Sequence, residues 1–264
     1  MNFLDRVLQE KANELAHKKS AVPLGDLKRL ASEAPPRDFA GVLSGGSRII
    51  AEVKKRSPRV ASFRQSETAD TLAPIYEKNG AAAISVVTDE VNFGTSLSDV
   101  RRIRSQVQLP VLVKDFIVDP YQVFEARAAG ADAVLLISRI LTEDTLTSLI
   151  ELTRTLGMQS LVEVHSAEDV EKALLAGAPI IGINNRDLDT LQVSRDTTRN
   201  LIGVIPQEAI IVSESGISRR EHVEELSQLG VDAFLIGGAL LESNDPGALL
   251  RTLADRDSKN KTTK

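Results

Sequence analysis

The chain contains no cysteine and no tryptophan among its 264 residues, and it has only three histidines. The absence of cysteine excludes disulfide bonds, thiolate nucleophiles and metal or iron–sulfur sites built on cysteine. The histidines, His17, His165 and His222, do not have the spacing of metal ligands, and we expect surface or packing roles for them. No metal site is therefore predicted.

Long apolar stretches and blocks of like charge are also missing. No apolar run approaches the roughly 18 residues that a membrane-spanning helix needs, and Met1–Arg6 lacks the basic-then-apolar pattern of a signal peptide. The net charge is −5, with Lys and Arg spread along the chain, so nucleic acid is not expected as a partner. We expect a cytoplasmic protein that does not bind membranes.

What the chain does have is a repeated strand–helix unit. After residue 47, short apolar runs typical of buried strands alternate with amphipathic helical patterns, for example at 143–156 and 167–175, as far as residue 254. Gly80, Gly130, Gly177 and Gly230 each close a helical pattern just before a strand pattern, the place where a left-handed residue ends a helix. Eight strands are predicted, starting near residues 48, 82, 110, 132, 159, 180, 209 and 232.

Eight alternating βα units predict an all-parallel sheet with helical crossovers, which is closed without edges in a (β/α)8 TIM barrel. A doubly wound open sheet is the alternative, but no Gly-x-Gly-x-x-Gly follows the first strand. We therefore expect one α/β domain over residues 1–264, with the barrel at 48–254. Residues 1–47 form a helical extension, with helices at 3–17 and 24–32, that packs on the barrel and would close its bottom; residues 255–264 form a disordered tail.

Several apolar runs end in residues suited to acid–base chemistry. Glu52 and Lys54 follow the first strand, Lys114 the third, Glu163 the fifth and Asn184 the sixth. Residues two apart share a face of a strand, and active sites of this fold lie at the C-terminal rim. Separate buried ion pairs are the alternative reading, but so many polar strand ends favour one convergent site and an enzyme.

Glycines follow the last two strands, where barrels of this type commonly bind phosphate through backbone N–H groups. They are Gly216 after the seventh strand and Gly237 and Gly238 after the eighth. Tight turns would also use glycine, so the alternative is a purely structural role. Phe93 and Phe116 lie at predicted strand tops, where they would form either rim packing or an apolar wall for an aromatic substrate.

These segments together resemble the indole-3-glycerol-phosphate synthase family of tryptophan biosynthesis. The resemblance rests on Ile50-Ala51-Glu52-Val53-Lys54, Val113-Lys114-Asp115-Phe116-Ile117, Leu161-Val162-Glu163-Val164, Gly182-Ile183-Asn184-Asn185-Arg186-Asp187-Leu188 and Glu214-Ser215-Gly216-Ile217. It implies a ring closure without cofactor, in which 1-(2-carboxyphenylamino)-1-deoxy-D-ribulose 5-phosphate becomes indole-3-glycerol phosphate, CO2 and water. It also implies a monomer that acts on this small phosphorylated substrate, with other tryptophan-pathway enzymes as candidate protein partners.

The resemblance assigns the polar residues to catalytic roles. Lys114 matches the family's general acid and Glu163 its general base. Lys54 matches a lysine that binds the substrate carboxylate and takes part in dehydration, and Glu52 and Asn184 match residues that orient these groups. The remaining matches are Ser215 and Arg186 in the surrounding polar shell, Phe93, Phe116 and Leu135 around the anthranilate ring, and Ser57, Gly216, Gly237 and Gly238 at the phosphate.

Three departures from the family pattern stand out. Arg59-Val60-Ala61-Ser62 replaces a second Ser and a nearby Gly in the loop that covers the phosphate, Phe93-Gly94-Thr95-Ser96 replaces Phe-x-Gly-Ser, and Gly238 replaces a Ser or Glu. None of these departures involves Lys114 or Glu163, so we expect an active enzyme with an altered affinity for its substrate.

Two other functions stay open. The altered loop is compatible with a non-catalytic phosphosugar-binding paralogue, and Lys114 at a strand end is compatible with a Schiff-base aldolase. Neighbouring Glu52 and Glu163 would keep Lys114 charged, which disfavours a nucleophilic amine.

Overall fold

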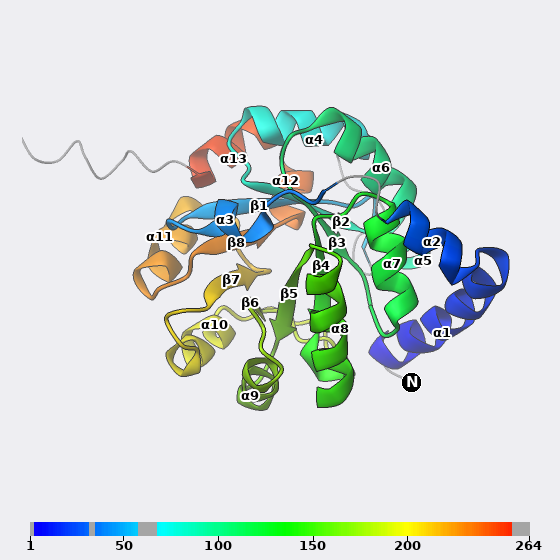
Figure 1. The fold of residues 1–264 in the computed structure, drawn as a ribbon. Coiled ribbons are helices and arrows are strands. Elements are labelled where there is room, and N and C mark those ends of the chain that lie inside the picture. Colours follow the sequence, from blue (N-terminus) through cyan, green and yellow to red (C-terminus); the bar gives the residue numbers. More distant parts are fainter. Residues whose placement is uncertain (1–2, 32–34, 58–67, 255–264) are drawn as a thin grey trace, which may run out of the picture.

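The computed structural model describes residues 3–31, 35–57 and 68–254, and its centre is a closed barrel of eight parallel strands (Figure 1). Each strand pairs with its neighbours in sequence order, and the barrel closes where Ile50 of the first strand pairs with Leu235 of the last. The predicted TIM barrel is confirmed and the open sheet is wrong. The strands are β1 (Arg48–Val53), β2 (Ala83–Val87), β3 (Val111–Lys114), β4 (Ala133–Ile137), β5 (Gln159–Val164), β6 (Ile180–Asn184), β7 (Ile210–Glu214) and β8 (Ala233–Ile236).

Helices surround the barrel and alternate with the strands (Figure 1). Each predicted strand start lies within one residue of the observed start, and the pattern at 167–175 is a helix over the same residues. The helices are α1 (Phe3–Ala21), α2 (Leu24–Leu30), α3 (Phe39–Leu43), α4 (Ala69–Lys78), α5 (Glu90–Phe93), α6 (Leu97–Gln106), α7 (Pro120–Ala128), α8 (Glu143–Thr155), α9 (Ala167–Leu175), α10 (Asp196–Leu201), α11 (Arg220–Gln228), α12 (Gly238–Glu242) and α13 (Pro246–Ala254), with short 3-10 turns η1 (Ser138–Ile140) and η2 (Ile202–Val204).

Strand alternation separates two apolar cores. In β1, Ile49, Ala51 and Val53 belong to the core between sheet and helices, whereas Ile50 belongs to the core inside the barrel. The interior below the C-terminal rim is filled by side chains and is therefore not a pore. Among the described residues, no helix is both long and apolar enough to cross a membrane.

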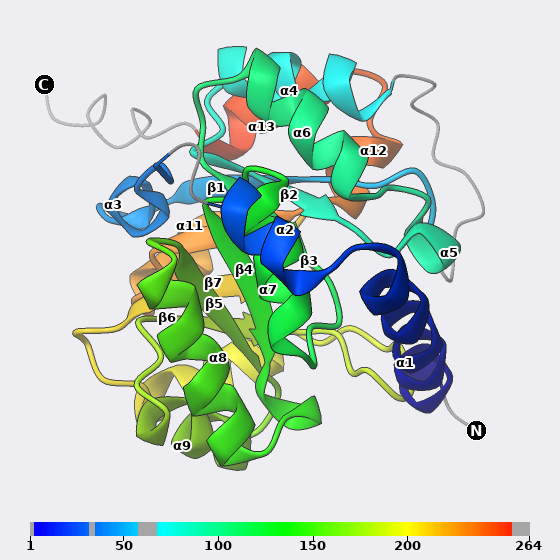
Figure 2. The same cartoon turned by 45° about the vertical axis from the view of Figure 1, so that its right-hand side comes forward.

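The bottom of the barrel is closed by the short helix α3, and not by the long N-terminal helix. Phe39 and Leu43 of α3 are fully buried and join the core inside the barrel. The backbone N–H of Ala40 donates to Gln159 at the start of β5, 2.7 Å away, which holds α3 at the N-terminal ends of the strands. The two expected helices instead form α1 and α2: α2 packs on the outside against α7 (Figure 2), whereas the first turns of α1 join the core inside the barrel through Leu4 and Val7. The expected tail at 255–264 lies outside the described residues.

A buried ion pair joins α1 to the loop after β3. Lys11 is 3% exposed, and its Nζ lies 3.0 Å from Oδ1 of Asp115 and 2.7 Å from Oε2 of Glu14. Burial alone would lower the pKa of Lys11, but Asp115 and Glu14 outweigh it and raise the pKa, so the amine stays charged. Asp115 also accepts a hydrogen bond from Thr88 after β2. The N-terminal helix is thus connected to the loops that follow β2 and β3.

Breaking this pair should be costly because it leaves a buried carboxylate without its cation. We expect Lys11→Met to lower the free energy of unfolding by about 3 kcal/mol, measured by denaturant unfolding followed by circular dichroism. Arg29→Met is the matched control, since Arg29 and Asp26 are 3.7 Å apart and largely exposed; it should cost about 0.5 kcal/mol or less. Equal losses in the two variants would contradict a special role for Lys11.

Candidate active site

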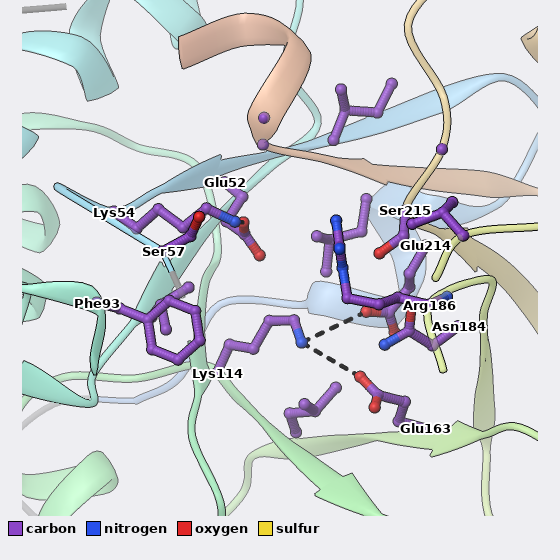
Figure 3. Close-up of a pocket in the computed structure, with 18 of the residues that line it drawn as sticks. Glu52, Lys54, Ser57, Phe93, Lys114, Glu163, Asn184, Arg186, Glu214 and Ser215 are labelled. Carbon is purple, nitrogen blue, oxygen red and sulfur yellow. Dashed lines mark hydrogen bonds and ion pairs between the residues drawn. The ribbon is translucent and has the colours of Figure 1, made fainter. Parts of the chain in front are cut away.

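A pocket of about 450 Å³ opens at the C-terminal rim of the barrel. The strands bring to it side chains that are far apart in the sequence (Figure 3). Every residue predicted for the site lines this pocket: Glu52, Lys54, Ser57, Phe93, Lys114, Phe116, Leu135, Glu163, Asn184, Arg186, Ser215, Gly216, Gly237 and Gly238. The structure locates these residues together, and their individual roles remain predictions.

Lys114 lies at the centre of the pocket, with its Nζ directed toward two carboxylates (Figure 3). The nitrogen is 3.2 Å from Oε2 of Glu163 and 3.7 Å from Oε2 of Glu214. Both glutamates are only 1% exposed. Such charge-assisted contacts in a dry environment are stronger than the same contacts in water.

Burial and neighbouring charges shift the pKa values of Lys114 and Glu163 in opposite directions. Burial lowers the pKa of Lys114, but the carboxylates of Glu163, Glu214 and Glu52 outweigh it, so the net shift is upward and the amine is charged. For Glu163, burial raises the pKa while Lys114 and His165 lower it, and the net direction is downward. The acid form of Lys114 and the base form of Glu163 therefore coexist near neutral pH.

Glu214 is a member of the cluster that the sequence reasoning did not assign to the site. Burial raises its pKa, and although Lys114 opposes this, repulsion from Glu163 and Glu52 adds to the rise, to about 8. Glu214 thus keeps its proton near pH 7 while Glu163 does not. The signal was present in the sequence, because Val212 and Glu214 share a face of β7 in the same way as Gly182 and Asn184 in β6.

Two glycines make room for the buried carboxylates. A β-carbon on Gly237 of the β8 end would overlap the carboxylate of Glu52, and one on Gly182 of β6 would overlap that of Glu214. Glu52 in turn forms an ion pair with Lys54. The predicted role of Gly237 in phosphate approach stays a prediction, and its missing β-carbon also leaves the space that Glu52 occupies.

The opposite side of the pocket is formed by the loops after β6 and β7. Ser215 and Gly216 are consecutive residues with φ of 65° and 77°, a conformation that glycine adopts readily and serine rarely. Asn185 supports this turn, since its side-chain amide donates to the carbonyl of Ser215 and to the hydroxyl of Ser213, both at 3.1 Å. The neighbouring α12 begins at Gly238, whose missing β-carbon would meet no atom within 4 Å.

Apolar side chains form the remaining wall. Phe93, Phe116 and Leu135 line the pocket as predicted, and Phe3 of α1 and Leu188 after β6 join them. Phe3 had no signal in the sequence, because its position depends on how α1 docks. The pocket therefore combines a charged interior with an apolar wall suited to an aromatic ring.

The loop after β1 is described only at its start. The backbone N–H groups of Lys55 and Arg56 both donate to the carbonyl of Phe93, and the Arg56 guanidinium donates to the carbonyls of Glu90 and Val91. The unusual segment Arg59–Ser62 lies outside the described residues. Over the described part of the chain, no group of three or more His, Cys, Asp or Glu residues could hold a metal ion.

Comparison with known proteins supports one family. The family model described as indole-3-glycerol phosphate synthase matches residues 4–253. The chain is 44% identical over 253 residues to an indole-3-glycerol phosphate synthase of Kineococcus radiotolerans, covering 93% of this chain and 92% of that protein. It is 45% identical over 257 residues to one of Dehalococcoides mccartyi, covering 95% of this chain and 99% of that protein.

Solved structures resemble the chain in fold. A 3-hexulose-6-phosphate synthase from Salmonella typhimurium aligns with a TM-score of 0.61 at 19% identity, covering 78% of this chain and 96% of that chain. At this identity the likeness concerns the barrel alone.

The raised pKa of Glu214 predicts a pH dependence of stability. Between pH 4.5, its ordinary pKa, and about 8, the folded state keeps a proton that the unfolded state has lost. The free energy of unfolding should therefore fall as pH rises through this window, by up to about 1.4 kcal/mol per pH unit. Glu214→Gln should remove this contribution, so that its stability relative to wild type increases from pH 5.5 to 8.

Denaturant unfolding at a series of pH values measures this difference. Glu143→Gln, on the exposed N-terminal turn of α8, is the control and should follow the wild-type pH dependence. Parallel curves for wild type and Glu214→Gln would show that Glu214 ionises normally.

Proposed function

The chain belongs to the indole-3-glycerol phosphate synthase family, and we propose that Lys114 and Glu163 are the general acid and general base of its reaction. The enzyme closes the indole ring of 1-(2-carboxyphenylamino)-1-deoxy-D-ribulose 5-phosphate, with loss of CO2 and water. The observation that carries the assignment is a buried, charged Lys114 whose Nζ is 3.2 Å from an ionised Glu163.

Ring closure needs an acid at the substrate's carbonyl oxygen. The aromatic carbon that bears the carboxylate bonds to the carbonyl carbon, and the oxygen takes a proton from Lys114 to become a hydroxyl. The bond to CO2 then breaks, and its electron pair restores the aromatic ring. A lysine held charged by Glu163, Glu214 and Glu52 supports this role, because it has a proton to give at neutral pH.

Dehydration needs a base and an acid together. The hydroxyl leaves as water after it gains a proton, while a proton is lost from the carbon next to nitrogen to form the indole double bond. Glu163 accepts that proton. Its lowered pKa keeps it ionised, and its position on β5 faces Lys114 on β3 across the pocket (Figure 3).

Lys54 and Glu52 form the second acid–base pair of the pocket. Lys54 binds the substrate carboxylate and assists the departing hydroxyl, and Glu52 orients Lys54 through their ion pair. Burial raises the pKa of Glu52, but Lys54, Lys114 and Arg186 outweigh it and lower the pKa, so Glu52 stays charged. Asn184, Arg186 and Ser215 complete the polar shell around the reacting groups.

The two ends of the substrate have matching surfaces. Phe93, Phe116 and Leu135 supply apolar area for the anthranilate ring. Ser57, Gly216 and Gly238 supply the polar groups for the phosphate, with backbone N–H groups at the latter two. Gly237 belongs with them in this proposal, and it also makes space for Glu52.

A Schiff-base aldolase is disfavoured by the same electrostatics. Schiff-base chemistry needs a neutral amine, usually one with a lowered pKa, whereas the carboxylates around Lys114 raise its pKa. A non-catalytic phosphosugar-binding role has no support from the pocket, which retains both the acid and the base.

We also propose that the enzyme acts as a cytoplasmic monomer and as a single domain. All the residues assigned to catalysis come from one chain's barrel, and a chain without cysteine suits a reducing compartment. Other tryptophan-pathway enzymes are its candidate partners. Sedimentation equilibrium of the purified protein tests the monomer.

Removing the acid or the base should abolish most of the chemistry. Lys114→Met and Glu163→Gln should each lower kcat by about 10²-fold or more, the usual size of a general acid or base contribution. Product fluorescence in steady-state assays measures kcat, and circular dichroism checks that each variant is folded. Wild-type kcat in Lys114→Met would remove the proposed acid.

The reaction should require no metal or nucleotide. Wild-type enzyme dialysed against EDTA should turn over the substrate at an unchanged rate, because all proposed proton transfers use side chains. Loss of activity that returns on adding a divalent cation would contradict the mechanism.

The phosphate assignment can be tested at Gly238, the first residue of α12. Gly238→Pro removes the backbone N–H at the first position of α12, whereas Gly238→Ala keeps it and has free space for its β-carbon. The proline variant should raise KM roughly 10-fold and weaken inhibition by inorganic phosphate, with a smaller effect on kcat. The alanine variant should raise KM far less. Equal KM values for the two variants would show that this amide does not bind phosphate.

A further inference from the structure

His165 lies next to the proposed base, although the sequence indicates only a surface or packing residue. It follows β5 two positions after Glu163, so both side chains lie on the same side of the strand. The His165 side chain is 8% exposed. Its ring is therefore held inside the protein beside the carboxylate.

Each ring nitrogen faces a different carboxylate. Nε2 lies 3.3 Å from Oε1 of Glu163, and Nδ1 lies 3.9 Å from Oδ2 of Asp169 on α9. The same Asp169 oxygen accepts a hydrogen bond of 3.0 Å from the backbone N–H of His165. Asp169 thus holds the residue by its backbone and limits the directions in which the ring can point.

Neither ring nitrogen has the geometry of a full hydrogen bond to any residue that the structure describes. Buried polar atoms without a partner are costly and rare, so each such atom requires an explanation. A carboxylate can only accept, so the nitrogen that faces it must carry the proton. The shorter distance favours a proton on Nε2, directed at Glu163.

The carboxylate of Glu163 consequently faces three donor groups, Lys114, His165 and Asn184. Oε2 faces Lys114 at 3.2 Å and Oε1 faces His165 at 3.3 Å. When Lys114 gives its proton to the substrate, its hold on Oε2 weakens, and this oxygen becomes available to accept a proton. The contact at Oε1 would then act with Asn184 to keep the carboxylate in place.

We propose that His165 is a positioning residue that holds Oε1 of Glu163, so that Oε2 stays directed at the substrate throughout the reaction. This inference rests on the proposed role of Glu163 as general base. Asp169 acts on the far side of the ring and sets its orientation. His165 itself does not contact the substrate, since it does not line the pocket.

Amide variants can separate the two contacts of the ring. Gln carries its amide nitrogen about where Nε2 lies, and therefore keeps a donor toward Glu163. Asn carries its nitrogen about where Nδ1 lies, so it keeps a donor only toward Asp169. Phe has the shape of the ring without either donor, which makes these three variants a matched set.

We expect His165→Phe and His165→Asn to lower kcat roughly 10- to 100-fold, because a displaced base loses alignment with its proton. His165→Gln should recover most of that loss, and KM should change less than about threefold in all three. If His165 were needed only for packing, the kcat of each variant would instead follow its side-chain size and its stability. Thermal unfolding of each variant measures that stability. Should His165→Phe fail to fold, the Asn and Gln pair alone gives the comparison.

A double-mutant cycle with Glu163→Gln completes the test. In that background His165→Phe should lower kcat by less than about threefold further, because its effect acts through the carboxylate. A large loss in Glu163→Gln with none in His165→Phe would overturn this inference alone, as would equal kcat values for His165→Asn and His165→Gln. Wild-type kcat in Glu163→Gln would overturn the proposed base and this inference with it.

Discussion

The proposed chemistry of this enzyme depends on one charged amine surrounded by three buried carboxylates. Lys114 faces Glu163 and Glu214 directly and senses Glu52 through space. Three like charges this close cannot all be ionised at neutral pH, so one of them keeps its proton. Glu214 is the one that does, because Lys114 alone opposes the effect of burial there, whereas Glu163 and Glu52 each have further neighbours that lower their pKa. Charged Lys114 and ionised Glu163 can then coexist in one small volume. The protonated Glu214 also leaves the pocket with less negative charge, which favours an anionic substrate.

The barrel makes this arrangement possible because it holds the groups on rigid strands and leaves space at chosen positions. Gly182 and Gly237 lack the β-carbons that would collide with the carboxylates of Glu214 and Glu52. The charges therefore fit side by side without pushing the strands apart. Closure of the bottom by Phe39 and Leu43 excludes water from the other end of the barrel interior, which keeps the electrostatic interactions above it strong.

The barrel and most of the pocket residues could be predicted from the sequence, and the same physical reasons explain which features could not. Parallel strands buried on both faces read as apolar runs, and glycines such as Gly130 mark the helix ends, so the barrel and its strand starts could be predicted. Polar residues at strand ends then necessarily share the C-terminal rim. Long-range packing is different: a five-residue helix such as α3 has too little periodicity to be assigned to the barrel floor. Nor can a sequence show that a glycine predicted to approach phosphate, such as Gly237, also leaves room for a neighbouring carboxylate.

The N-terminal helix shows how such long-range contacts reach the chemistry. Lys11 binds Asp115, the residue directly after Lys114, and Asp115 also accepts from Thr88 and from the backbone of Phe116. A buried ion pair contributes more to the specificity of a position than to net stability, because desolvation offsets much of its attraction. Here that specificity fixes the segment that carries the proposed acid and, through Phe116, one wall of the pocket. The helical extension is therefore part of the pocket's architecture, since it restrains the loop that directly follows Lys114, the proposed proton donor.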